Sequence, residues 1–333
     1  MKNKLLLSTA LIGSVAISGA AVAETKIKGS IQYTYTAESG ATAAGSKQGA
    51  GIEKQIDISN SGELDNGMSY SAGFSLEADG NEAMDNGEGN YISFTSGNTT
   101  VMWNNDKAKN LSDSATPRVG QMAQTMAAGS VTTAAYDHSA GTMAKDQWNL
   151  ALTQKLDGIG ELNVVYAPRA GDDGAGNDQA NDMSQTNSIL DVIYKGNFGV
   201  DGLTVFAGIS DHEKDNTTQT QAFKATKYGI GYAFGQFAAG VTQQKMDQTD
   251  GTEDESTEYG ITYSVNDQLS LGVLRADTEL ANTTGEESIT GIQAGYNLGP
   301  VGVELYHVTI EEVKSVAANK DIERLGLRLT TKF

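Results

Sequence analysis

Residues 321–333 read DIERLGLRLTTKF, and apolar and polar side chains alternate through this stretch as far as Phe333. Successive side chains of a β-strand point to opposite faces. One face would carry Leu325, Leu327 and Leu329, and the other would carry Arg324 and Arg328. A strand with one apolar and one polar face suits a boundary between lipid and water. We therefore predict a membrane-spanning β-strand at residues 321–333.

The other end of the chain has the pattern of a secretory signal peptide. Lys2 and Lys4 precede an apolar run, and the small residues Ala21 to Ala23 precede Glu24. This order of a basic, an apolar and a small-residue region predicts cleavage after residue 23. The apolar run is shorter than the roughly 20 residues of a transmembrane helix. The predicted domains are a signal peptide at 1–23 and an exported domain at 24–333.

The composition favours a water-filled barrel over a globular core. Hydrophobic residues make up only 38% of the chain, and there are 39 glycines against 3 prolines. In a membrane barrel the apolar residues form an outer band while the interior stays polar. The absence of cysteine excludes disulfides and thiolate sites. The net charge of −19 argues against a nucleic-acid partner, because phosphates require Lys and Arg.

Alternating strands continue along the chain in pairs. Within a pair the strands are separated by tight turns such as Phe234-Gly235-Gln236 and Gly299-Pro300. Longer polar segments separate the pairs, and in the second half we predict them at residues 211–221, 245–256, 277–287 and 311–320. Short turns that alternate with long loops are typical of an antiparallel up-and-down membrane barrel with periplasmic turns and extracellular loops.

The strand count is sixteen if residues 105–146 form one loop, and seventeen if residues 131–137 are also a strand. An even number is required if both ends of the exported chain lie on the periplasmic side. We therefore predict an all-β barrel of sixteen strands. This order places Tyr33, Tyr35 and Tyr166 at the outer rim, and Tyr194, Tyr263, Tyr296 and Phe333 at the inner rim, as two aromatic girdles.

Two segments resemble a known family. Residues 61–68 (SGELDNGM), which lead into Gly73-Phe74-Ser75-Leu76-Glu77, are similar to the second hairpin of Gram-negative general diffusion porins. The closing strand and its Phe333 resemble the outer-membrane assembly signal. The resemblance implies a homotrimer in the cell outer membrane, in contact with lipid, lipopolysaccharide and the assembly machinery. It also implies that the third loop folds into each pore.

Residues 105–146 occupy the position of that constriction loop. This segment carries the candidate constriction residues Asp106, Lys107, Lys109, Asp113 and Arg118. The resemblance implies an acidic loop that faces basic wall residues across the pore, which would set a transverse field.

The pattern departs from the enteric members of the family in two respects. The loop lacks their Pro-Glu-Phe-Gly-Gly run, and strands two to four show no inward arginine cluster. The basic residues that point inward are instead on the first and last strands, namely Lys26, Lys28, Arg324, Arg328 and, close to the rim, Lys332. They are either constriction residues or solvated charges of the channel wall, and the sequence leaves both interpretations open.

The functional prediction is passive diffusion of small hydrophilic solutes and ions, with a mild cation preference that follows from the acidic composition. The alternatives are a substrate-specific channel and a structural or adhesive barrel, for which about eight strands suffice. No enzyme activity is expected. His307, in phase with Leu305, is the single candidate at a lipid-facing wall, and His138 and His212 fall in predicted loops. No cofactor is expected, although the acidic stretches 211–215 and 247–258 could bind Ca²⁺ loosely.

Overall fold

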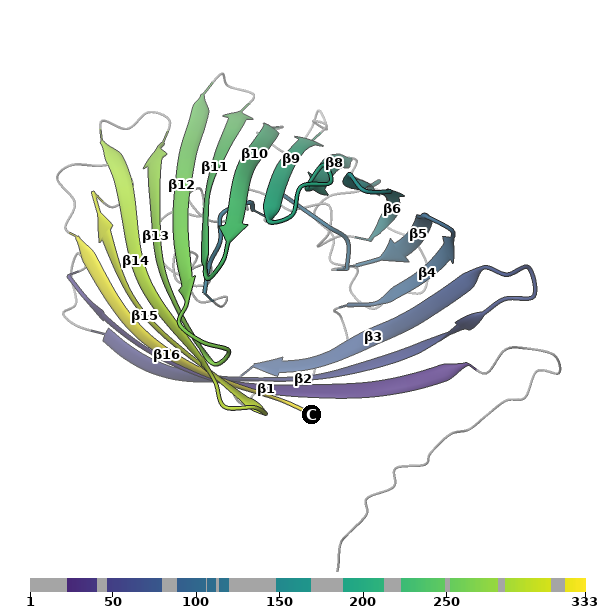
Figure 1. Cartoon of the computed structure of the whole chain (residues 1–333), viewed down its shortest axis with the longest axis horizontal. Helices are drawn as coiled ribbons and strands as arrows, with labels where there is room; N and C mark the ends of the chain where they lie inside the picture. The colour runs from purple at the N-terminus through teal and green to yellow at the C-terminus, as the bar shows by residue number, and fades with distance from the viewer. Residues whose placement is uncertain are drawn as a thin grey trace, which may run out of the picture.

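The computed structural model describes residues 23–40, 47–79, 89–105, 107–111, 114–119, 148–168, 188–212, 223–248, 252–280, 285–312 and 321–333. These residues form one closed antiparallel barrel in which each strand pairs with its neighbours in the sequence (Figure 1). This confirms the predicted fold class and the count of sixteen strands. Residues 131–137, the proposed extra strand, lie outside the described residues, as do residues 1–22 of the predicted signal peptide.

The strands are β1 (Glu24–Ser39), β2 (Lys47–Glu63), β3 (Ser69–Asp79), β4 (Tyr91–Ser96), β5 (Thr99–Asn104), β6 (Asn149–Leu156), β7 (Gly160–Ala167), β8 (Ile189–Gly196), β9 (Leu203–His212), β10 (Phe223–Phe234), β11 (Phe237–Gln248), β12 (Glu253–Ser264), β13 (Leu269–Glu279), β14 (Glu286–Asn297), β15 (Val301–Glu311) and β16 (Ile322–Lys332). Among the described residues, no helix is long and apolar enough to cross a membrane.

The barrel closes where β16 pairs with β1, as the pattern of residues 321–333 predicted. Register partners along this seam run from Ser30 and Lys332 to Ser39 and Glu323. Phe333 extends the pairing, because its N–H donates to the carbonyl of Gly29 at 2.9 Å and its own carbonyl accepts from Gly29 at 2.8 Å. The seam therefore continues to the end of the chain.

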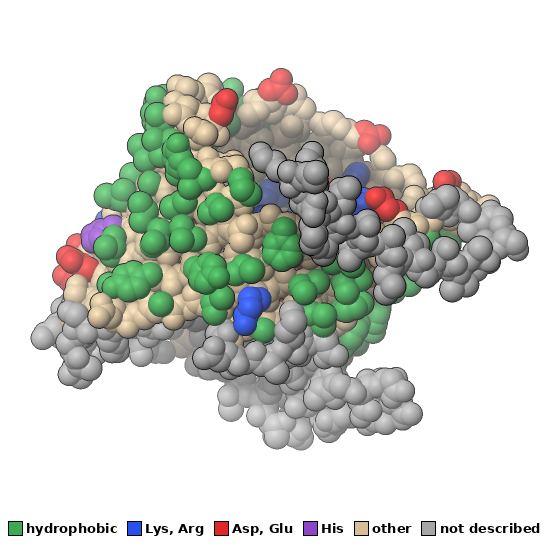
Figure 2. Space-filling model, turned by 90° about the horizontal axis from the view of Figure 1, so that it is seen from below, with side chains coloured by type: hydrophobic (Ala, Val, Ile, Leu, Met, Phe, Trp, Pro, Cys, Tyr) green, Lys and Arg blue, Asp and Glu red, His purple; other side chains and the backbone are tan. Residues whose placement is uncertain are grey.

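The alternation of side chains divides the wall into an outer apolar face and a largely polar inner face. Ile261 and Ile292 point outward and are 58% and 59% exposed, whereas the inward Thr242 and Gln293 are 2% and 3% exposed. Hydrophobic side chains cover much of the outer surface seen in Figure 2. An outer apolar band of this kind is what a barrel wall in contact with lipid requires.

Aromatic rings line the short-turn end of this outer face. Tyr232, Phe234, Phe237 and Tyr263 follow one another from β10 to β12, with ring centroids 6.3, 5.8 and 4.6 Å apart. Offset aromatic contacts at such distances are favourable, and aromatic belts mark the edge of the apolar zone. The predicted inner-rim position of Tyr263 agrees with this belt.

Several strands extend further than the sequence pattern indicated. Residues 245–256 were predicted to be a loop, but β11 continues to Gln248 and β12 begins at Glu253. His212, also predicted to lie in a loop, is the last residue of β9. Backbone pairing continues above the apolar band, where neither face needs apolar side chains, so the alternation that identifies a strand disappears before the strand ends.

Candidate channel constriction

The segment that follows β5 crosses the inside of the barrel. Its described parts are residues 107–111 and 114–119, and Figure 1 shows this segment within the ring of strands. At its start, the Lys107 N–H donates to Asn104 Oδ1 at 2.9 Å, and the Lys107 ammonium lies 3.4 Å from Ser75 Oγ on β3. At its end, the Val119 N–H donates to Gln293 Oε1 on β14 at 2.9 Å. The segment therefore extends from one side of the inner wall to the other.

Glycines on consecutive strands form a smooth bed for this segment. Leu111 packs at Gly208 on β9, Ala115 and Pro117 pack over β10 to β12, and Val119 packs over β13 and β14. The members of this glycine bed are Gly208, Gly231, Gly240, Gly260, Gly272 and Gly295. Gly231 pairs with Gly240, and Gly240 pairs with Gly260, so the centre of the bed is a continuous cross-strand row. The missing side chains allow the loop backbone to approach the wall closely.

We predict that Gly240→Val displaces the segment and raises the single-channel conductance. A Cβ at Gly240 would lie 2.7 Å from the Ala115 carbonyl oxygen and 3.0 Å from Pro117 Cδ. Overpacking of this kind costs about 1–3 kcal/mol. The described parts of the segment belong to no strand ladder, whereas Gly240 is paired on both sides, so the segment is expected to move. Conductance in a planar bilayer measures the result.

Gly49→Val is the matched control for this substitution. Gly49 lies on the inner face of β2, and a Cβ there would meet no atom within 4 Å. Its conductance should remain that of the unmodified protein. Equal conductance for Gly240→Val and the unmodified protein would contradict the role of the glycine bed.

Polar contacts fasten the segment to the wall at β11 and β12. Ser114 Oγ and Thr116 Oγ1 each lie 2.8 Å from Thr242 Oγ1. The Arg118 guanidinium forms an ion pair with the Glu258 carboxylate, and their side chains are only 12% and 7% exposed. We call Arg118, Thr242 and Glu258 the latch. A buried ion pair restricts the loop strongly, because separating the two charges leaves each of them uncompensated.

The structure places three of the five predicted loop residues. Lys107 and Lys109 are exposed, and Arg118 is held in the latch. Asp106 and Asp113 lie outside the described residues. The latch has the opposite polarity to the arrangement that the resemblance implied, because here the loop supplies the cation and the wall supplies the carboxylate.

The predicted basic residues of β1 and β16 all lie on the inner face, in a different sector from the glycine bed. Arg324 Nε donates to Glu38 Oε2 at 2.8 Å, and Arg328 Nε donates to Gln32 Oε1 at 2.6 Å. Lys26 forms an exposed ion pair with Glu24 at 3.0 Å. Both arginines are largely buried by these contacts, so they belong to the wall itself.

Sequence reasoning missed Glu258, Thr242, Gln293 and the glycine bed. The acidic stretch 247–258 was interpreted as an outer loop, so Glu258 was not recognised as a residue of β12 whose side chain points into the channel. The signal that could have identified the bed is the presence of glycine at inward positions on several consecutive strands. Such positions mark close backbone approach in a sheet.

The described residues offer one group of three carboxylates, formed by Glu53 on β2 and by Glu77 and Asp79 on β3. One oxygen from each lies within 4.8 Å of the others. This group is not in the stretches 211–215 and 247–258 where loose Ca²⁺ binding was predicted. The outward-facing His307 has Ile292 and Leu325 as register partners, and neither can act as a nucleophile or orient the imidazole.

Comparisons with known proteins agree with this architecture. A sequence profile described as Gram-negative porin matches residues 8–315. An anion-selective porin from Comamonas acidovorans superposes with a TM-score of 0.69 at 12% identity, covering 94% of this chain and 100% of that chain. A variant of the Rh. blastica porin gives 0.62 at 15% identity, with 93% and 100% coverage. The trimer form of OmpT from Vibrio cholerae gives 0.64 at 11% identity, with 94% and 100% coverage. A search among curated proteins gives no match.

Proposed function

Since the chain belongs to the Gram-negative porins and is an outer-membrane channel, we propose that small hydrophilic solutes and ions cross it by passive diffusion. The observation that carries this proposal is the closed ring of strands, which continues to β16 and has a largely polar inner face. Barrels of about sixteen strands are too wide for their own side chains to fill, and they leave an aqueous passage. Family and fold point to a channel rather than to an enzyme.

The loop segment at the glycine bed is the proposed constriction. It narrows the passage from the side of the wall formed by β9 to β14. The basic residues Lys28, Arg324 and Arg328 lie on another sector of the wall, formed by β1 and β16. Solutes are selected by size and by the field in the remaining opening.

The proposed ion selectivity is a mild cation preference. Arg118 and Arg324 are each paired with a wall carboxylate, so these two cations are compensated locally. The chain as a whole carries a net charge of −19. An acidic surface raises the local cation concentration at the mouths of the passage, and this effect weakens as salt screens it.

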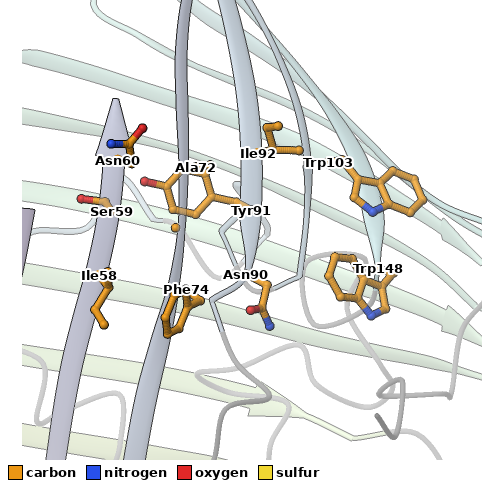
Figure 3. A pocket seen from close by; sticks show the side chains of 11 residues that line it. Ile58, Ser59, Asn60, Ala72, Phe74, Asn90, Tyr91, Ile92, Trp103 and Trp148 are labelled. Atoms are coloured by element: carbon orange, nitrogen blue, oxygen red, sulfur yellow. The ribbon is translucent and has the colours of Figure 1, made fainter. Parts of the chain in front are cut away.

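Trimer formation is part of the proposal and rests on the short strands β4 and β5. Each has 6 residues, which reach about 20 Å along the strand and about 15 Å in height after tilting, against an apolar zone of about 25 Å. Their outer face carries an apolar groove of about 510 Å³ between Ile58 on β2 and Trp103 on β5 (Figure 3). Trp103 stacks on Trp148 there at 6.2 Å. Such a sector suits contact with neighbouring subunits better than contact with lipid.

Export and assembly complete the proposal. Residues 1–23 act as the signal peptide, and the strand that ends at Phe333 presents the signal read by the outer-membrane assembly machinery. The outer rim then contacts lipid and lipopolysaccharide.

Planar-bilayer recording of the refolded protein tests the proposed function. We expect the channels to close in three equal current steps and the current to grow linearly with voltage. Under a salt gradient, the reversal potential should indicate a mild cation preference. This preference should decline at high salt because of screening. Saturable current that one solute blocks would replace general diffusion by a substrate-specific channel. The absence of current from folded, heat-modifiable protein would contradict the channel altogether.

A further inference from the structure

A small pocket lies on the inner side of the wall between β1, β3 and the start of the loop segment. Its volume is about 290 Å³, and Lys28, Asp57, Ser75, Tyr91 and Lys107 contribute to its lining. Lys28, Asp57 and Ser75 form one cross-strand row, since Lys28 pairs with Asp57 and Asp57 pairs with Ser75. The volume is at the lower end of the range for ligand pockets, so a small solute is the appropriate occupant.

Two lysines from different elements reach this pocket, and neither has a carboxylate partner among the described residues. Lys28 comes from β1, and Lys107 comes from the loop. In the described part of the chain neither ammonium group lies within ion-pair distance of a carboxylate, and the Lys107 ammonium contacts only the Ser75 hydroxyl, at 3.4 Å. Four other basic residues predicted to face the channel differ in this respect, because Lys26, Arg118, Arg324 and Arg328 have acidic partners. The pocket therefore has positive charge available for an anion.

Asp57 adds a hydrogen-bond acceptor to the same pocket. Its Oδ1 accepts from Gln55 Nε2 at 3.0 Å and from Ser75 Oγ at 2.7 Å. Within the described residues its Oδ2 accepts no hydrogen bond. A ligand that combines an oxyanion with an O–H donor would satisfy both the lysines and this free oxygen.

We propose that this pocket is a binding subsite for small oxyanions that carry their own hydroxyl donor, of which inorganic hydrogen phosphate is the simplest. Lys28 and Lys107 hold the anionic oxygens, and Asp57 Oδ2 accepts the hydroxyl proton. The subsite rests on the proposed channel function, because it assigns a class of solute to a position on the channel wall. It allows a channel with acidic mouths to retain a particular class of anion at its inner wall.

Phosphate block of chloride current tests the subsite. In potassium chloride at constant ionic strength, added phosphate should lower the current saturably, and sulfate, which lacks the hydroxyl donor near neutral pH, should act more weakly. The double variant Lys28→Gln/Lys107→Gln should require about tenfold more phosphate for half-maximal block, because two short-range charge interactions are lost. Asp57→Asn keeps an Oδ1 acceptor for Gln55 and Ser75 but loses the acceptor for the phosphate hydroxyl. In this variant phosphate and sulfate should block the current at nearly equal concentrations.

Lys155→Gln is the control for loss of a positive charge outside the pocket, and it matches the single variants Lys28→Gln and Lys107→Gln in charge. Lys155 is an exposed residue of β6, outside the pocket, and its loss removes one positive charge. It should leave the phosphate response unchanged. If Lys155→Gln weakens the block as much as the double variant does, the effect is one of overall charge and the subsite is wrong.

The channel function and the subsite can fail separately. Normal potassium chloride current with no phosphate effect would overturn the subsite and leave the channel intact. If no current is observed at all, broadening of the ³¹P resonance of phosphate by the refolded barrel in detergent still decides the subsite. Broadening that Lys28→Gln/Lys107→Gln abolishes would support it, and an unchanged resonance would overturn it.

Discussion

Glu258→Ala is expected to release the constriction segment from the wall. The substitution removes the ion pair with Glu258 from the Arg118 guanidinium, which is 12% exposed. Removing one member of a buried ion pair costs about 3–5 kcal/mol. The segment at 107–119 can move the charge into water by leaving the glycine bed, so local opening is cheaper than unfolding of the barrel. Hydrogen exchange of this segment should become at least about a hundredfold faster, and conductance should become larger and noisier.

Glu255→Ala provides the control on the same strand. Glu255 lies on the outer face of β12, where it forms an exposed ion pair with Lys245 at 3.0 Å. Exposed pairs contribute about 0–1 kcal/mol, so exchange at 107–119 should not change. The double variant Arg118→Met/Glu258→Met removes both charges and should exchange more slowly than Glu258→Ala. Exchange in the double variant as fast as in Glu258→Ala would show that the uncompensated charge of Arg118 is not what releases the segment.

The sequence predicted the barrel well because one simple physical rule governs the wall. Where a strand crosses lipid, every second side chain must be apolar, and this rule identifies β16 and the hairpin of β10 and β11 from their residues alone. The rule also explains where prediction failed. Above the lipid both faces of a strand are polar, so the upper part of β12, with Glu258 as an inward residue, resembled an acidic loop.

The constriction was less predictable, because its contacts join residues far apart in the chain. Arg118 and Glu258 are 140 positions apart, and nothing local to either residue indicates the pair. The glycine bed is likewise spread over β9 to β14, with single members on different strands. Lys28 and Lys107 were both identified as channel residues from the sequence, but their shared pocket becomes visible only when β1 and the loop are placed together.

Gly326→Val is expected to weaken the closing seam of the barrel. Tyr306 on β15, Gly326 on β16 and Thr36 on β1 form one cross-strand row. The Tyr306 ring lies directly over Gly326, and its hydroxyl reaches Thr36 Oγ1 at 3.1 Å. A tyrosine that covers a glycine of a neighbouring strand fixes the register of a curved sheet. A Cβ at Gly326 would occupy the position of the ring, so Tyr306, now 3% exposed, would be expelled into the lumen.

Expulsion of the buried Tyr306 ring should lower the free energy of unfolding of Gly326→Val by about 3 kcal/mol. A denaturant titration of the refolded barrel measures this loss. Gly302→Val is the matched control, because Gly302 faces inward on β15 and its Cβ would meet only the Thr330 carbonyl oxygen, at 3.9 Å. Tyr306→Phe should cost only about 1 kcal/mol, the value of the hydrogen bond to Thr36. The decisive comparison uses Tyr306→Ala as background, in which Gly326→Val should have little further effect, since the ring that it displaces is already gone. If Gly326→Val lowers the free energy of unfolding as much in that background as in the unmodified protein, the loss of stability comes from the backbone of β16 itself and not from the displaced ring.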